Sequence, residues 1–290
     1  MPQLDIIPPH ELSTLARFQG EPALAAIRRE FVPAVTNPVW RGLVEEFMEL
    51  DEPLTPYAHP RHPAWSFAAS PGSGAHHGHI GGLALHVLQD LRNARALGDA
   101  HEARGLPLDR GLMYAAILLH DCLKRFVYAF DADYTLHKSE DPFIARNEDH
   151  HSWVLRELTA RGADEEIILA TAAMHGLDDV SLAEGVKPLA VVNHYLDIGL
   201  TGLTMRPEDV RAEHAIGFLA DSDWPWSGRA QQRTRELAKA MAPHCGVPDG
   251  YMHLYLGSRF SFEYVDGVLQ DMGRELAMAL LLEGMEKDNT

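Results

Sequence analysis

Histidine is unusually frequent in this chain, and several histidines stand near carboxylates in apolar surroundings. There are 17 His among 290 residues, and imidazole is the commonest protein ligand of transition metals. His120 and Asp121 directly follow the apolar run 115–119, and Asp197 is the single carboxylate of the apolar segment 189–200. Burying a carboxylate beside an imidazole is unfavourable unless a cation compensates the charge, and a divalent metal ion is the simplest such cation. These residues therefore predict a metal site.

The candidate ligands come from separate helical segments rather than from one short motif. They are His86, His120, Asp121 and Asp197. Their order, His, then His-Asp, then Asp, resembles the HD superfamily of metal-dependent phosphohydrolases. Residues 76–86 (HHGHIGGLALH) are similar to the HHxYxGGLxxH segment of the branch that includes bacterial 3′-to-5′ exoribonucleases, and residues 118–124 (LLHDCLK) and 193–197 (NHYLD) are similar to its LLHDIGK and HYAD segments. The resemblance covers residues 76–200.

Two positions depart from the pattern of that family. His79 stands where relatives have Tyr, and Cys122-Leu123 replace the usual Ile-Gly before Lys124. Neither change removes a ligand, but both lie near the expected pocket, so the resemblance does not define the substrate.

The resemblance implies two more histidine ligands where such a site holds two metal ions. His175, in the segment that closes a predicted helix at Gly176, resembles one of them. The other is His150 or His151. Spacing counted back from His175 favours His151, whereas spacing counted from Gly162 favours His150. Both histidines are therefore candidates.

This ligand set indicates which metals bind and what chemistry they support. Imidazole-rich ligation with two carboxylates suits Fe, Mn, Co, Ni or Zn better than Mg, which prefers oxygen ligands. Asp121 is predicted to bridge two ions about 3.5 to 4 Å apart, a separation at which a shared water becomes a nucleophile at neutral pH. Lys124 is expected to clamp a phosphate, so Asp121 and Lys124 are the predicted catalytic residues. The predicted substrate-binding residues are His76, His77, Lys124 and Arg125.

These features favour a metal-dependent phosphohydrolase that cleaves a phosphoester by attack of a metal-bound hydroxide. Lys plus Arg number 25 and Asp plus Glu number 42, which gives a formal net charge of −17. Because such a chain repels nucleic-acid phosphates on average, a nucleotide or another small phosphorylated metabolite is the favoured substrate over long nucleic acid.

Two other classes of function use the same ligands. HD-type di-iron oxygenases, which cleave a C–C or C–P bond with O₂, resemble this chain in having six ligands and a lysine after the HD pair. Iron content together with O₂ consumption distinguishes them from hydrolases. The third class is a non-enzymatic sensor or interaction module with a structural metal, which would be inert toward both phosphoesters and O₂.

The apolar periodicity predicts an all-α fold, an HD-domain-like helical bundle with additional N- and C-terminal helices. Asn37 and Asp109 are predicted N-caps and Gly98 a predicted C-cap, whereas residues 221–228 (DSDWPWSG) predict a turn and the proline-rich residues 53–71 a loop. The predicted helices span residues 37–50, 78–98, 109–126, 147–162, 163–176, 187–200, 207–219, 228–242 and 262–285.

The expected organisation is an N-terminal extension at 1–70, a metal-binding core at 71–200 and C-terminal helices at 201–290, packed as one compact domain. The two cysteines are too few for a disulfide framework, the apolar runs are too short to span a bilayer, and the N-terminus lacks the pattern of a signal peptide. These features predict a cytoplasmic protein without a membrane segment, and they leave homo-oligomerisation open.

Overall fold

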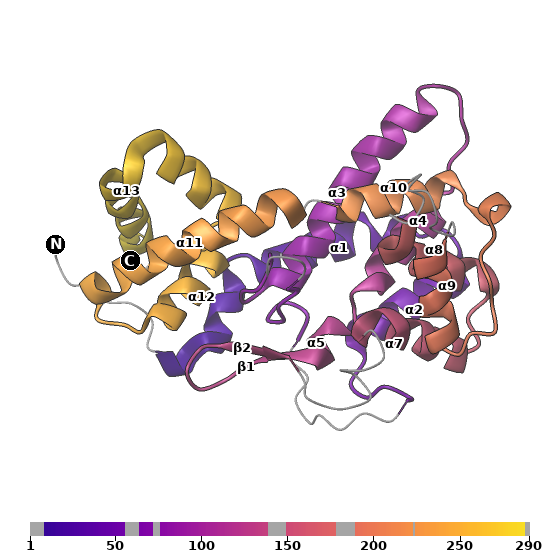
Figure 1. Cartoon of the computed structure of the whole chain (residues 1–290), viewed down its shortest axis with the longest axis horizontal. Helices are drawn as coiled ribbons and strands as arrows, with labels where there is room; N and C mark the ends of the chain where they lie inside the picture. Colours follow the sequence, from indigo (N-terminus) through magenta and orange to yellow (C-terminus); the bar gives the residue numbers. More distant parts are fainter. Residues whose placement is uncertain are drawn as a thin grey trace.

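The chain folds into packed helices, as the sequence predicts, with one small hairpin in the part that is described (Figure 1). The structure is a computed structural model and describes residues 9–55, 64–71, 76–138, 149–177, 189–222 and 224–287. The elements of its N-terminal half are η1 (Pro9–Arg17), α1 (Gly20–Glu30), η2 (Val32–Ala34), α2 (Pro38–Glu49), α3 (Gly82–Glu102), α4 (Arg110–His120), α5 (Lys124–Val127), β1 (Tyr128–Phe130) and β2 (Leu136–Lys138). The remaining elements are α7 (Asp149–Ala160), α8 (Glu165–Gly176), α9 (Ala190–Ile198), η5 (Pro207–Asp209), α10 (Ala212–Asp221), α11 (Trp224–Cys245), α12 (Asp249–Arg259) and α13 (Phe262–Lys287).

Side-chain caps define where several of these helices begin. The Asn37 side chain accepts hydrogen bonds from the backbone at the start of α2, and Asp109 and Asp164 do the same for α4 and α8. Such caps satisfy N–H groups that have no partner inside the helix. The caps predicted at Asn37 and Asp109 are confirmed.

Some predicted boundaries are wrong. Helix α3 continues past Gly98 to Glu102, and the glycine instead gives room to Leu108, whose Cδ2 would lie 2.9 Å from a Cβ at that position. The predicted turn at 221–228 is largely helical, since α11 begins at Trp224 and a proline is tolerated in the first turn of a helix.

Other predicted elements are broken or fall partly outside the described residues. The last predicted helix is interrupted at Gly273, where φ is 74°. The predicted start of a helix at Pro188 lies outside the described residues, and α9 begins at Ala190. Residues 64–71 of the predicted proline-rich loop contain no helix or strand, whereas 56–63 also lie outside the described part.

The core consists of two hydrophobic clusters. The larger one extends from Ala23 in α1 to Ala220 in α10 and surrounds α4, whose eleven residues are all buried except the first. The second cluster joins η1 and Ile80 to helices α11, α12 and α13, which lie at the opposite end of the molecule from α8 and α9 (Figure 1). The three units predicted from the sequence stay a prediction. None of the described helices combines the length and the hydropathy that a membrane crossing requires.

His214 on α10 is expected to make the stability depend on pH. Burial is the main cause that lowers its pKa to about 4, with Arg211 adding to the shift and Glu213 and Asp209 opposing it. Because an unfolded histidine titrates near pH 6.5, the unfolded chain binds the proton first as the pH falls, and stability is lost between about pH 6.5 and 4. At pH 5 the expected loss from this group is about 2 kcal/mol.

Urea unfolding of the His214→Asn variant at pH 7 and pH 5 measures this contribution. The backbone N–H of Arg211 donates to Nδ1 of His214 over 3.2 Å, and the Asn side chain keeps an acceptor there without titrating. The variant should lose less stability than the wild type between the two pH values. An equal loss in both proteins would show that His214 is not responsible.

Candidate metal centre

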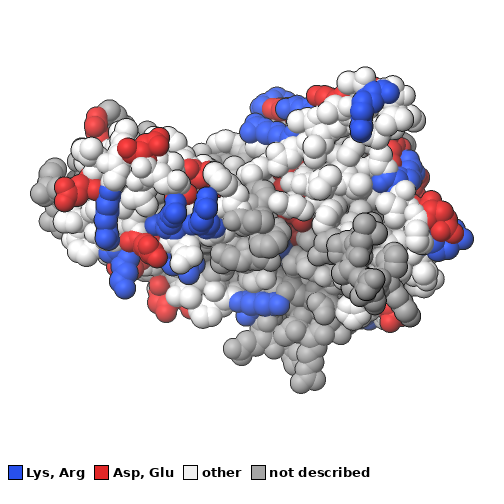
Figure 2. Space-filling view, turned by 45° about the horizontal axis from the view of Figure 1, so that its top comes forward, with Lys and Arg blue, Asp and Glu red and all other residues white. Residues whose placement is uncertain are grey.

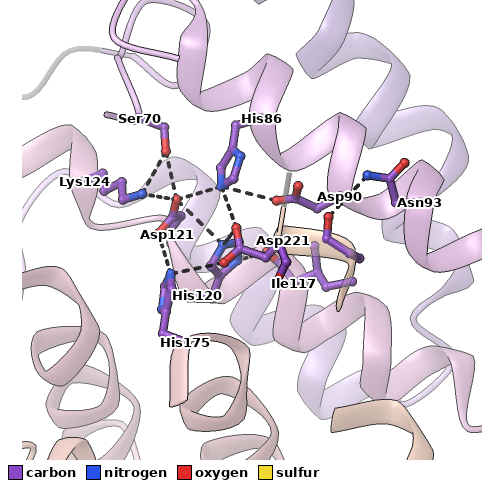
Figure 3. A network of polar contacts seen from close by, with 12 residues as sticks. Ser70, His86, Asp90, Asn93, Ile117, His120, Asp121, Lys124, His175 and Asp221 are labelled. Carbon is purple, nitrogen blue, oxygen red and sulfur yellow. Dashed lines mark hydrogen bonds and ion pairs between the residues drawn. The ribbon is translucent and has the colours of Figure 1, made fainter. Parts of the chain in front are cut away.

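Asp121 lies at the C-terminal end of α4, in the middle of a buried cluster of imidazoles and carboxylates (Figure 3). Its Oδ1 is 3.1 Å from Nε2 of His150 and 3.5 Å from Nε2 of His175. Its Oδ2 is 3.0 Å from Nε2 of His86 and 3.7 Å from Nε2 of His120. The two oxygens of one carboxylate therefore face two different pairs of imidazole nitrogens, which come from α3, α4, α7 and α8.

Two further carboxylates surround His86. Asp90, one turn along α3, places Oδ2 3.3 Å from Nε2 of His86, and Asp221, the last residue of α10, places Oδ1 3.2 Å from the same nitrogen. The oxygens of Asp221 also lie 3.7 Å from Nε2 of His120 and of His175. A ring nitrogen carries at most one hydrogen, so Nε2 of His86 cannot donate to three carboxylates at once. A cation among these groups would satisfy them together.

The backbone determines which nitrogen of His120 faces the cluster. Nδ1 of His120 lies 2.6 Å from the carbonyl oxygen of Ile117 and donates its hydrogen there. In the neutral ring Nε2 then has its lone pair directed toward Asp121 and Asp221, which is the form in which imidazole binds a metal. The groups whose ligand atoms lie within 4.8 Å of one another include His86–Asp90–His120–Asp221 and His120–Asp121–His175. The donor set therefore fits a transition-metal ion.

The charges in this cluster follow from burial and from close neighbours. Burial opposes ionisation of His86, but Asp90, Asp121 and Asp221 together raise its pKa well above the usual value. Burial would likewise raise the pKa of Asp121, yet Lys124 and the nearby imidazoles hold that pKa well below its usual value. The carboxylates therefore stay charged, and positive charge on the imidazole side, a proton or a metal ion, compensates them.

His150 and His151 both lie near the cluster, but in different positions. His150 is the one whose Nε2 approaches Asp121, whereas the ring of His151 lies 3.8 Å from the ring of His175 and 5.0 Å from that of Tyr195. Burial lowers the pKa of His175 to about 4 and that of His151 well below its usual value. Both rings are neutral at pH 7, the state that a ligand needs. The geometry favours His150 as the histidine beside Asp121.

His76 and His77 are buried beside His86, at ring centroid distances of 5.7 and 5.0 Å. The turn that carries them depends on two glycines. Gly81 has a φ of 82°, a left-handed conformation that glycine adopts without strain. A Cβ on Gly82 would lie 1.9 Å from the carbonyl oxygen of His77. The glycine pair therefore allows this turn to approach the start of α3.

Replacing Gly82 by alanine is expected to displace the turn and to destabilise the protein by about 3 kcal/mol, because the new methyl group meets backbone rather than a flexible side chain. Chemical denaturation and metal content measure the effect. Gly42→Ala in α2 is the matched control, since a Cβ there meets nothing within 4 Å and alanine favours a helix. Equal stability of the two variants would contradict the close approach.

Lys124 and Ser70 contact the same carboxylate. Nζ of Lys124, which is buried, lies 2.6 Å from Oδ2 of Asp121 and donates to Oγ of Ser70 over 3.1 Å. Oγ of Ser70 donates to Oδ2 of Asp121 over 2.8 Å. A turn after α4, in which the backbone N–H of Lys124 donates to the carbonyl of Asp121, holds this arrangement.

Two of the residues singled out in the sequence do not join the cluster. Asp197 is exposed on α9, because that helix buries Val192 and Leu196 and the residue after Leu196 faces outward. Arg125 is buried, but its guanidinium donates to the carbonyl oxygens of Met48 and Leu50, so it holds the end of α2. Within the described residues, Asp197 therefore lies away from the histidine–carboxylate cluster, and Arg125 contacts the backbone at the end of α2.

Asp221 and Asp90 are the cluster members that sequence reasoning missed. Asp221 follows the apolar stretch 215–220, and Asp90 is the single carboxylate within 83–91. Both carry the signal that singled out Asp121, a carboxylate after or inside an apolar run. In the structure, the Asn93 side chain on α3 donates to the carbonyl of Ala220 over 3.2 Å and holds the end of α10 against α3 (Figure 3).

Fold and site together define an all-α protein with a buried histidine–carboxylate cluster that could bind metal ions. The chain is 29% identical over 123 residues to dihydroneopterin 2′,3′-cyclic phosphate phosphodiesterase of Methanocaldococcus jannaschii. The match covers 42% of this chain and 47% of that enzyme, so the chain spans about half the length of the curated relative. No family model matches the chain, and no solved structure gives a significant match.

Proposed function

We propose that this protein is a metal-dependent phosphohydrolase of the HD type that cleaves a phosphodiester in a nucleotide or another small phosphorylated compound. The observation that carries the proposal is the position of Asp121, between two pairs of imidazole nitrogens and in contact with Lys124. The similarity to a relative named as a phosphodiesterase of a cyclic phosphate supports the same reaction class.

Two sets of side chains would hold divalent ions, with Asp121 shared between them. The sets are His86, His120, Asp221 and Asp90 on one side, and His150 and His175 on the other. Mixed imidazole and carboxylate ligands suit Fe, Mn, Co, Ni or Zn. Bound divalent ions lower the pKa of water and neutralise charge that develops on a phosphoryl group.

Lys124 supplies a fixed positive charge beside these groups. An ammonium has three N–H donors, and within the described residues the partners of Nζ are Asp121 and Ser70. A third donor is available to a phosphoryl oxygen. The buried rings of His76 and His77, next to His86, offer further polar atoms from the turn before α3.

Replacing Lys124 by methionine is expected to leave the metal content unchanged and to lower turnover about a hundredfold, since the charge that faces the phosphoryl group is lost. Lys124→Arg keeps a cation at this position and should retain more activity than the methionine variant. Steady-state kinetics and elemental analysis of the same preparations measure both effects. Full activity of Lys124→Met would show that Lys124 has no role in the reaction.

The first experiment on the proposed function is elemental analysis of the protein as purified, joined to a panel of phosphodiesters that includes 2′,3′-cyclic nucleotides. Bound Fe, Mn, Co, Ni or Zn and hydrolysis that a chelator abolishes are the expected results. An oxygen electrode serves as the control for the alternative chemistry. O₂ uptake that depends on substrate, without phosphate ester cleavage, would favour an oxygenase, and a metal-loaded protein that does neither would favour a sensor.

A further inference from the structure

A cavity lies between the β1–β2 hairpin and helices α11 and α12. Its volume is about 640 Å³, which is within the range of pockets for small organic ligands. The hairpin contributes Tyr128, Tyr134 and Lys138 to the wall. Two aromatic side chains and an ammonium are therefore present on this side of the cavity.

Helix α11 presents one line of polar side chains to the same cavity. Gln231, Arg235 and Lys239 all line it, and their spacing of four residues puts them on one face of the helix. Together with Lys138 they bring three cationic groups to the cavity, against the carboxylates of Glu236 and Asp249. Figure 2 shows Lys and Arg side chains next to Asp and Glu side chains over the C-terminal helices, in a chain whose net charge is −17. The three cationic groups make this cavity more favourable for an anionic ligand than the rest of the acidic surface.

Two buried polar groups in the cavity lack partners among the described residues. Both the nitrogen and the oxygen of the Gln231 carboxamide are without a hydrogen bond, although the side chain is 1% exposed. Nε2 of His253, on α12, is also buried without a hydrogen bond. Burial lowers the pKa of this histidine to about 4, so the ring is neutral at pH 7. A buried carboxamide without hydrogen-bond partners destabilises the folded protein. A ligand with adjacent donor and acceptor atoms would satisfy it.

Two chain segments connect the cavity to the candidate metal centre. Pro71, which lines the cavity, directly follows Ser70, whose Oγ contacts Asp121. Gly78, also in the lining, directly follows His77, whose ring lies 5.0 Å from that of His86. The backbone N–H of Ser70 donates to the carbonyl of His77 over 3.1 Å and joins the two segments. A molecule in the cavity is thus adjacent to the segments that cover the metal ligands.

We propose that this cavity binds the nucleobase end of the substrate, with the Gln231 carboxamide pairing with the donor–acceptor edge of the base and Arg235, Lys239 and Lys138 attracting an anionic ligand to the cavity. The flat base has room beside Tyr128 and Tyr134, and a carboxamide matches the edge of a nucleobase through two hydrogen bonds. This inference rests on the proposed function because it deepens the substrate class of the same site.

Calorimetric titration of the full chain tests this inference without any turnover. The probes are the four nucleoside 5′-monophosphates, and ribose 5-phosphate serves as the ligand without a base. At least one nucleotide should bind ten times more tightly than ribose 5-phosphate. Gln231→Leu should abolish this difference without lowering the thermal midpoint, because an apolar side chain removes an unsatisfied buried group.

Gln232→Leu is the matched control, since the adjacent Gln232 on α11 is exposed. It should bind all ligands as the wild type does. Equal binding of ribose 5-phosphate and every nucleotide, or a base preference that persists in Gln231→Leu, would overturn the inference. Base-dependent binding in a protein that hydrolyses no phosphodiester would instead support the cavity and contradict the proposed function.

Discussion

Replacing Asp221 by asparagine is expected to lower phosphodiester turnover at least about a thousandfold, which is about 4 kcal/mol of transition-state stabilisation. Asp221 brings its carboxylate within 3.2 Å of Nε2 of His86 and 3.7 Å of Nε2 of His120. Burial opposes its ionisation, but the neighbouring imidazoles hold the pKa of Asp221 well below its usual value, so the carboxylate is charged. The asparagine side chain has nearly the same shape but no charge to balance a divalent ion. Metal content and steady-state kinetics measure the loss.

Asp197→Asn is the matched control for this variant. Asp197 is exposed on α9, so its charge is screened by water and its loss should leave metal content and turnover unchanged. The pair of variants compares the ligand that the sequence pattern suggests with the one that the structure suggests. Loss of metal in Asp197→Asn but not in Asp221→Asn would contradict the geometry of the cluster.

Replacing Asp121 by asparagine is expected to have the second large effect, a loss of bound metal together with activity. Its two oxygens each face one pair of imidazole nitrogens, so its removal affects the ligands on both sides. Added metal raises the thermal midpoint of a protein that binds it in the folded state, and this rise should disappear in the variant.

The increase in thermal midpoint on adding metal distinguishes the loss of a metal ligand from a general destabilisation of the fold. Each protein is melted in chelator and then with added metal, so that only the difference is compared between the wild type and Asp121→Asn. Gln232→Leu, an exposed change on α11, serves as the reference for a harmless substitution. A variant that keeps the metal-dependent increase would exclude Asp121 as the shared ligand.

Local sequence signals predicted much of the helical fold. The caps at Asn37 and Asp109 act over two or three residues, so the sequence around them is enough to place the starts of α2 and α4. Gly98 is an example of what local signals do not predict, because the neighbour that lies against this glycine is Leu108, in the segment that follows the helix.

The composition and order of the residues by themselves pointed to an all-α chain with a cluster of histidines and carboxylates, because apolar periodicity and buried polar groups are properties of local sequence. Tertiary structure decided which carboxylates meet those histidines. Asp197 and Asp221 both accompany apolar runs, but α9 turns Asp197 outward while the packing of α10 against α3, α4 and α8 turns Asp221 inward. Which face of a helix is buried depends on its neighbours in space, and these come from distant parts of the chain.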